Sequence, residues 1–250
     1  MEEAAMSDSD NIPTARRSFL KQVAGAGSVL SLQAGAAALV VQKPALAQSA
    51  PPSADPLPGY IFFSSDEAAF VETMVNIMCP ADEFTPNGVD CGLALFMDRQ
   101  LAGDFGRGAK RYMRGPWQQG KPQHGYQLPL TPEQYFRAGV EGANLECRKR
   151  HGKTFDRLRP DEADAFLSEL ASGKANDARI ALGSWFNELV YPLFAQACFA
   201  DPIYGGNRNK LFWKMIGYPG LPATNMVNML QYRGKPFPGA RDPKSISDFS

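Results

Sequence analysis

The segment 131–152 reads TPEQYFRAGVEGANLECRKRHG and predicts one complete helix. Thr131 provides the N-cap, Pro132 takes the first helical position, and Gln134 completes a capping box. Apolar residues then recur at helical spacing and form one stripe, at Phe136, Val140, Ala143 and Cys147. Three cationic residues precede Gly152, which ends the pattern. Because a single stripe cannot be buried alone, other elements must pack on this helix.

Four further segments carry apolar residues at the same spacing, and each is predicted to be a helix. These segments are 64–78, 92–101, 160–171 and 178–199. Ser64 and Glu67 form a capping box at the start of the first, and Pro192 is expected to kink the last. Residues 225–231 are expected to form a short final turn. No segment alternates like a strand, so we predict an all-α fold, an irregular bundle of about five helices with long ordered loops.

The first 47 residues have the pattern of a twin-arginine export signal. The motif residues are Arg16, Arg17, Phe19, Leu20 and Lys21. A weakly apolar run follows, and Ala45 and Ala47 supply a small-x-small cleavage site. Because the run is mostly Ala, Gly and Ser, it would insert poorly as a membrane anchor. We therefore expect a periplasmic protein with a cleaved signal, and retention of the segment as an anchor is the alternative.

The rest of the chain divides by composition into three parts. Residues 48–63 are rich in Pro, Ser and Ala and predict an exposed leader. Residues 64–233 form the predicted helical domain, and the polar residues 234–250 form a loose C-terminal tail. The twin-arginine route carries folded proteins, so the chain is expected either to hold a cofactor or to accompany a partner that holds one.

The sequence is poor in the groups that catalysis and metal binding need. The chain has two histidines, His124 and His151, and lacks a Cys-x-x-Cys-His haem motif and Glu-x-x-His pairs. Its formal net charge is zero, which argues against a nucleic-acid partner. The long irregular segment 103–130, with Asp104 and His124, would be the site of an independent enzyme. The carboxylates Glu83, Asp90, Asp98 and Glu188 are interpreted as solvated or capping groups.

The four cysteines allow three pairings in an oxidising compartment. Cys79 and Cys91 flank a Pro/Gly loop between two predicted helices, and we favour a disulfide between them. It would close a ring of about a dozen residues and contribute roughly 3 kcal/mol. For Cys147 and Cys198 three alternatives stay open: a second bridge, buried thiols, or a bond to a partner chain.

Residues 201–220 read DPIYGGNRNKLFWKMIGYPG, and we call them the glycine–aromatic loop. Paired glycines allow a tight turn with close backbone approach, and the neighbouring aromatics either pin the loop to the protein's own core or offer area to a partner. The sequence alone leaves both interpretations open.

The loop also carries a resemblance. Tyr204-Gly205-Gly206-Asn207, followed by Trp213-Lys214 and Ile216-Gly217-Tyr218-Pro219-Gly220, resembles the C-terminal signature of the gluconate 2-dehydrogenase subunit 3 family. Cys79-Pro80-Ala81-Asp82, Thr131-Pro132 and Phe199-Ala200-Asp201-Pro202 fall in the expected order. The similarity covers roughly residues 64–220.

The resemblance implies an all-helical small subunit that carries the export signal and has no catalytic residue or cofactor. Its partner would be a large FAD-containing dehydrogenase subunit, and a membrane-attached multihaem cytochrome c subunit often completes such a complex. The complex would oxidise D-gluconate or a related polyol, sugar or sugar acid at the inner membrane. Tyr204, Gly205, Gly206, Asn207 and Trp213 would be structural or interface residues. A periplasmic helical binding module or chaperone without a redox partner is the alternative function.

Overall fold

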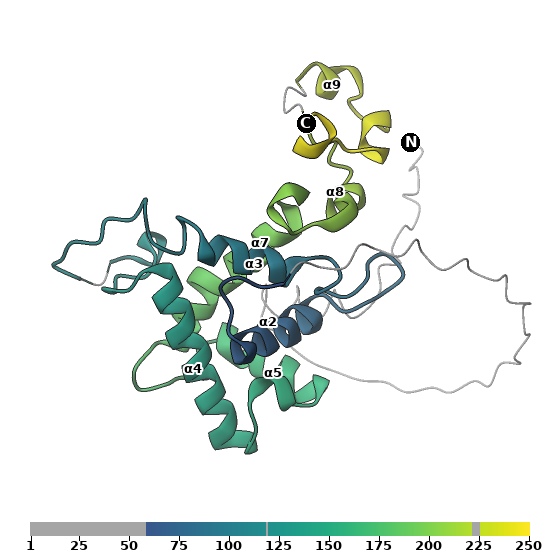
Figure 1. Cartoon of the computed structure of the whole chain (residues 1–250). Helices are drawn as coiled ribbons and strands as arrows, with labels where there is room; N and C mark the ends of the chain where they lie inside the picture. Colours follow the sequence, from purple (N-terminus) through teal and green to yellow (C-terminus); the bar gives the residue numbers. More distant parts are fainter. Residues whose placement is uncertain (1–58, 119, 222–225) are drawn as a thin grey trace, which may run out of the picture. The chain divides into compact units, whose positions relative to one another are not determined.

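The computed structural model describes residues 59–118, 120–221 and 226–250 (Figure 1). All described residues belong to the second of two units of the chain, Ala54–Ser250. The predicted export signal lies outside the described residues, with Arg16, Arg17, Phe19, Leu20, Lys21, Ala45 and Ala47.

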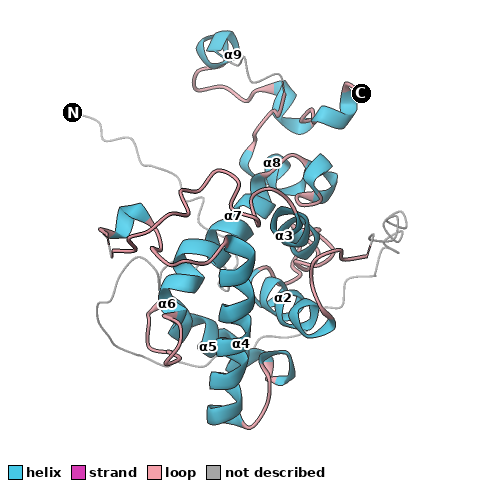
Figure 2. Ribbon diagram, turned by 60° about the vertical axis from the view of Figure 1, so that its left-hand side comes forward, coloured by secondary structure: helices cyan, strands magenta, loops and turns pink. Residues whose placement is uncertain are grey.

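The second unit is built from helices, which confirms the predicted all-α fold (Figure 2). The α-helices are α2 (Ser65–Met78), α3 (Leu93–Ala102), α4 (Pro132–His151), α5 (Pro160–Ala171), α6 (Leu182–Trp185), α7 (Tyr191–Phe199), α8 (Leu211–Ile216) and α9 (Met226–Gln231). Short 3-10 turns connect them. Within the described ranges, β-pairing is limited to one isolated bridge between Gly220 and Lys244.

Both predicted capping boxes form. The Glu67 carboxylate accepts a hydrogen bond from the Ser64 backbone N–H at 2.8 Å, and the Gln134 side chain accepts one from the Thr131 N–H at 3.0 Å. Each satisfies a donor that the first turn of a helix cannot pair internally. Gly152 ends α4 in the left-handed conformation, with φ of 70°.

The predicted helix 178–199 begins later and is discontinuous. Its α-helical part starts at Leu182, and Phe186–Val190 forms a π-helical turn between α6 and α7. The Tyr191 N–H donates to the Phe186 carbonyl, five residues back. Pro192 has no N–H to donate to the preceding turn, and its ring crowds that turn. The kink predicted at Pro192 therefore takes the form of a π-turn just before it.

Trp185 occupies the centre of the core and is fully buried. Its ring centroid lies 6.1 Å from that of Phe70 on α2 and 6.4 Å from that of Phe136 on α4. Gly139 lets α4 approach the indole, because an added Cβ would lie 2.1 Å from the Trp185 ring. Helices α2, α4 and α5 lie side by side around this cluster (Figures 1 and 2).

The last part of the predicted leader is packed, which corrects the expectation of an exposed segment up to residue 63. The backbone N–H groups of Ile61, Phe62 and Phe63 each donate to the Asp98 carboxylate at 2.9 Å. Asp98 is fully buried on α3. The interpretation of Asp98 as a solvated or capping carboxylate is therefore wrong, since its side chain is buried and binds three N–H groups that precede α2.

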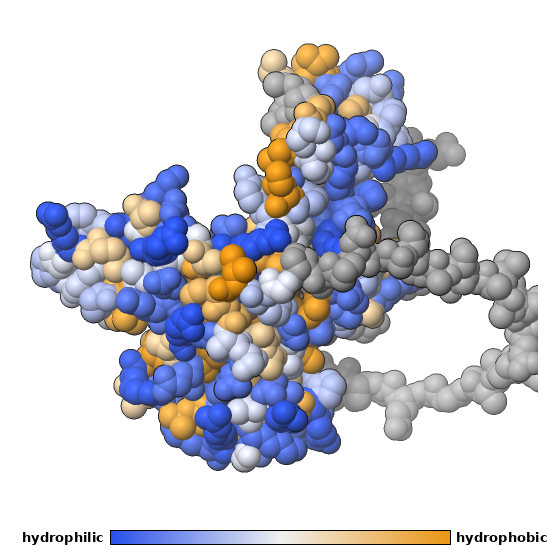
Figure 3. Space-filling model, viewed as in Figure 1, coloured by the Kyte–Doolittle hydropathy of each residue, from blue (hydrophilic) through white to orange (hydrophobic). Residues whose placement is uncertain are grey.

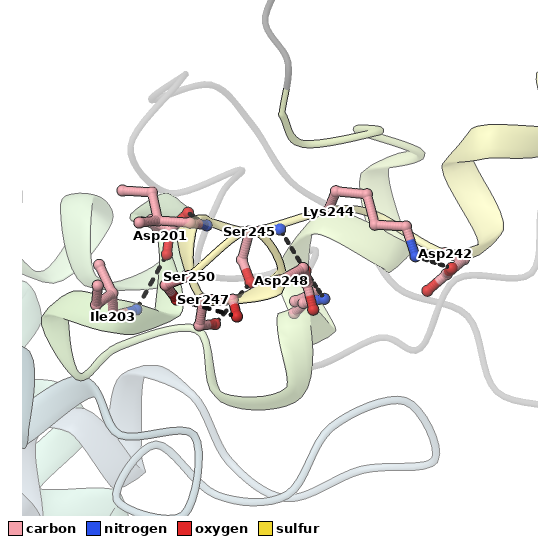
Figure 4. A network of polar contacts seen from close by, with 10 residues as sticks. Asp201, Ile203, Asp242, Lys244, Ser245, Ser247, Asp248 and Ser250 are labelled. Atoms are coloured by element: carbon pink, nitrogen blue, oxygen red, sulfur yellow. Dashed lines mark hydrogen bonds and ion pairs between the residues drawn. The ribbon is translucent and has the colours of Figure 1, made fainter.

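The C-terminal tail is also held in place, which corrects the prediction of a loose segment. The Lys244 N–H donates to the Pro219 carbonyl at 3.0 Å, and the Ile246 N–H donates to Asp201 at 2.9 Å. Asp248 also forms an ion pair with Lys210. Figure 4 shows further polar contacts of Asp201 with Ile203 and of Asp248 with Ser245. The Lys210 ammonium lowers the pKa of Asp248 below its usual value. The tail therefore lies against the glycine–aromatic loop.

Of the helices described, none combines the length and apolar character needed to cross a membrane.

Candidate functional site

The glycine–aromatic loop has an unusual backbone. Three non-glycine residues adopt left-handed φ values: Asn207 at 48°, Asn209 at 56° and Lys210 at 58°. Such conformations cost free energy for residues with a side chain, and they persist only where the surroundings enforce them. The loop is therefore held in one shape by specific contacts.

Asn207 provides two of these contacts. Its side-chain Nδ2 donates to the Ala200 carbonyl at 3.1 Å, and its Oδ1 accepts from the Phe212 N–H at 3.0 Å. The side chain is fully buried, so the two bonds join the residue after α7 to the first turn of α8 without competition from water. Asn207 is thus a structural residue.

Trp213 fixes the next part of the loop. Its Nε1 donates to the Phe199 carbonyl at 2.8 Å, and its ring packs edge-on against Tyr218 with centroids 5.1 Å apart. The indole is buried. Trp213 therefore pins α8 to the end of α7 and is structural as well.

The two glycines permit close backbone approach. An added Cβ on Gly206 would lie 2.4 Å from the Ala197 carbonyl oxygen. Gly205, with φ of 102°, places its carbonyl oxygen 2.1 Å from where a Cβ on Gly92 would lie. The Arg208 N–H donates to the Cys91 carbonyl at 3.1 Å in the same contact. Both glycines are therefore explained by packing against α7 and against the loop before α3.

Tyr204 is the member of the predicted set that reaches the surface, with half of its area exposed. It lines a groove of about 580 Å³ between α3 and the end of α7. The groove residues are Phe96, Gln100, Gln196, Phe199, Ala200 and Tyr204. We define the apolar surface as the exposed large residues beside this groove and on α8, namely Phe199, Ile203, Tyr204, Met215 and Ile216.

Exposed apolar side chains continue on the following helix. Met226, Val227, Met229 and Leu230 of α9 are all more than half exposed, and Figure 3 shows apolar residues over this helix. Exposed apolar residues that gather on a protein surface are typical of sites of protein association. The sequence prediction missed α8 and its exposed residues. The available signal was the run LFWKMI, which is too apolar on all sides for a helix that buries one face.

All four cysteines are buried, and none of the bridges predicted for them is present in this structure. The thiols of Cys79 and Cys91 are hydrogen-bonded to each other, and this contact, followed by burial, raises the pKa of Cys91 far above its usual value. Cys198 also raises the pKa of Cys91, through an electrostatic interaction. Burial raises the pKa of Cys147 to about 12. The favoured Cys79–Cys91 bridge stays a prediction for the oxidised protein.

The two residues proposed for an independent enzyme site are both exposed. Asp104 is exposed and forms an ion pair with Arg107 at 2.7 Å. His124 is exposed, in a short 3-10 turn of the segment 103–130. Neither side chain lines a groove or cleft described here.

The sequence model of the gluconate 2-dehydrogenase subunit 3 family matches residues 65–220, which is more than half of the chain and includes the whole glycine–aromatic loop. No curated protein and no solved structure matches the chain.

Proposed function

Because the chain belongs to the gluconate 2-dehydrogenase subunit 3 family, we propose that it is the non-catalytic small subunit of a FAD-dependent gluconate 2-dehydrogenase-type complex. In this proposal it exports and stabilises the flavoprotein subunit, which oxidises D-gluconate or a related sugar or polyol. FAD belongs to that partner, and haem c belongs to a third, cytochrome subunit. The complex works in the periplasm, attached to the inner membrane.

The observation that carries this proposal is the apolar surface on a rigid support. Tyr204 and Ile203 are exposed directly beside the buried Asn207, whose side-chain bonds fix the loop. A surface that is already ordered loses little conformational entropy when a partner binds. Exposed aromatic and apolar residues around a groove suit a large protein partner, since such residues are enriched at the centres of interfaces.

The export role is tested by fractionation of cells that produce both subunits. Replacing the motif arginines, Arg16→Lys with Arg17→Lys, is expected to leave this chain and the flavoprotein in the cytoplasm. Arg157→Lys, at an exposed position of the helical unit, is the control and leaves export unchanged. If the flavoprotein still reaches the periplasm with the double variant, the export role is wrong.

The interface is tested by co-purification with the flavoprotein subunit. The wild-type chain is expected to form a stoichiometric complex that has a flavin spectrum. Tyr204→Asp places a charge at the groove within the apolar surface and is expected to weaken the complex at least about tenfold. Tyr112→Asp is the matched control, because Tyr112 is a 79 % exposed tyrosine in the distant segment 103–130. Equal affinity for both variants would place the interface elsewhere.

The alternative functions give different results in the same preparation. A helical chaperone or binding module without a redox partner would be recovered with proteins that lack a flavin spectrum. An independent enzyme would turn over a sugar as a single purified chain, and Asp104→Asn or His124→Ala would abolish that turnover.

A further inference from the structure

A second hollow lies beneath the segment 103–130, away from the apolar surface. We call it the Glu188 cleft. It measures about 520 Å³, and its main polar and aromatic lining residues are Tyr126, Gln127, Tyr135, Ser184 and Glu188. A volume of this size is within the range of small-molecule sites. The cleft is thus formed by the long segment, by α4 and by the helix that contains the π-turn.

The π-turn explains how a carboxylate comes to line this cleft. Glu188 is the middle residue of Phe186–Val190, where the hydrogen-bond register widens before Pro192. Turns of this kind inserted in α-helices are frequent at functional sites. The Gly125 backbone passes over the carboxylate, since an added Cβ would lie 4.0 Å from Glu188 Oε2. The segment 103–130 therefore covers Glu188.

The protein supplies hydrogen-bond donors to only part of the Glu188 carboxyl group. Ser184 donates a hydrogen bond to it, but Oε2 is buried and has no hydrogen-bond partner among the described residues. A buried acceptor without a hydrogen-bond partner destabilises the folded chain. Burial also raises the pKa of Glu188 above its usual value. A ligand group that donates a hydrogen bond to Oε2 would remove this cost.

The aromatic wall of the cleft is rigid. The rings of Tyr126 and Tyr135 pack with centroids 4.2 Å apart. The Arg111 guanidinium lies 3.9 Å from the Tyr126 ring centroid and donates to the Tyr126 carbonyl at 2.9 Å. Rings held in this way offer an apolar surface beside a few polar groups, among them Glu188, which is the usual composition of a small-molecule site.

The charges around the cleft restrict the ligand. Arg111 acts electrostatically on Glu188, and Lys121 also lines the cleft, so a cationic donor would meet two like charges. An anionic group would be repelled by the ionised Glu188 carboxylate. We propose that the Glu188 cleft binds a hydroxylated small molecule and that an uncharged hydroxyl of this ligand donates to Glu188.

Sorbitol is a suitable probe, and glucamine has the same carbon chain with an amine in place of one terminal hydroxyl. Saturation-transfer NMR on the full chain is expected to detect sorbitol binding, with glucamine weaker. Glu188→Ala is expected to weaken sorbitol binding about tenfold, because the ligand loses its buried acceptor. Glu141→Gln, at an exposed carboxylate on α4, is the control and leaves binding unchanged.

Three results would overturn the proposal: no saturation transfer to sorbitol, equal binding by wild type and Glu188→Ala, or tighter binding of glucamine. Should Glu188→Ala fail to fold, Leu128→Trp gives a second test. Leu128 lines the cleft from the segment 103–130, and an indole at this position would fill it. If the Leu128→Trp variant still binds sorbitol, the binding site is not the Glu188 cleft, and the proposal is wrong. The test does not involve the flavoprotein, so its outcome is independent of the proposed subunit role.

Discussion

The Asn207 side chain accepts a hydrogen bond from the Phe212 backbone N–H at 3.0 Å, across a turn in which three residues adopt left-handed φ values. The same side chain donates to the Ala200 carbonyl. Asn207→Ala removes both buried bonds and is expected to lower the free energy of unfolding by about 2 kcal/mol, measured by urea denaturation. Asn209→Ala is the control, since Asn209 is also left-handed but exposed. If the two variants lose the same stability, the backbone conformation alone would account for the effect.

The approach of Gly205 to Gly92 gives a second prediction. A Cβ at Gly92 would lie 2.1 Å from the Gly205 carbonyl oxygen, so Gly92→Ala must separate the two loops. We expect it to destabilise the chain by more than about 2 kcal/mol in thermal unfolding. Gly152→Ala is the control. Gly152 has a left-handed φ of 70°, like Gly92, but no atom lies within 4 Å of the position that its Cβ would take. This substitution is expected to cost only about 1 kcal/mol. If both variants lose the same stability, the close approach of Gly92 to the Gly205 carbonyl is not present.

The helices were predictable from local signals, and the exceptions have physical causes. Ser64 and Thr131 both start helices because a capping box depends on residues three positions apart. The anchoring of Phe63 by Asp98 depends on a contact between residues 35 positions apart, which no local pattern reveals. The prediction of a loose tail failed for the same reason, because the hydrogen bond from the Ile246 N–H to Asp201 joins residues that are far apart in sequence.

The candidate site was predictable only in part. The motif residues around Asn207 were identified, but their spacing could not separate buried Asn207 and Trp213 from exposed Tyr204. Glu188 was interpreted as a solvated or capping carboxylate, because the sequence showed no partner base or metal site for it. Its place in a cleft depends on the π-turn before Pro192 and on the covering segment around Gly125, which are tertiary features.

The hydrogen-bonded thiols of Cys79 and Cys91 lead to a prediction about oxidation. In the exported protein, alkylation before and after reduction, followed by mass spectrometry, is expected to show a disulfide between these two residues. Cys79→Ser with Cys91→Ser is then expected to lower stability by roughly 3 kcal/mol under oxidising conditions and by much less after reduction. Cys147→Ser is the control, because the stability that this variant loses relative to wild type should be the same with and without the reductant. Free Cys79 and Cys91 thiols in the exported protein would contradict the bridge.

Glu188 predicts a specific pH dependence of stability. Burial raises its pKa in the folded chain above the value of 4.5 that an unperturbed glutamate has, whereas Arg111 opposes this shift. Protonation of Glu188 therefore favours folding: its contribution is complete below pH 4.5 and is lost as the pH rises through the raised pKa. Because Glu188→Gln cannot ionise, the stability of this variant relative to wild type, measured by urea denaturation, should increase as the pH is raised above 4.5. The other titratable residues that face the cleft are the same in both proteins and cancel in this comparison; they are Tyr126, Tyr135 and Lys121. A constant difference across the range, as expected for the exposed control Glu141→Gln, would show that Glu188 is not desolvated.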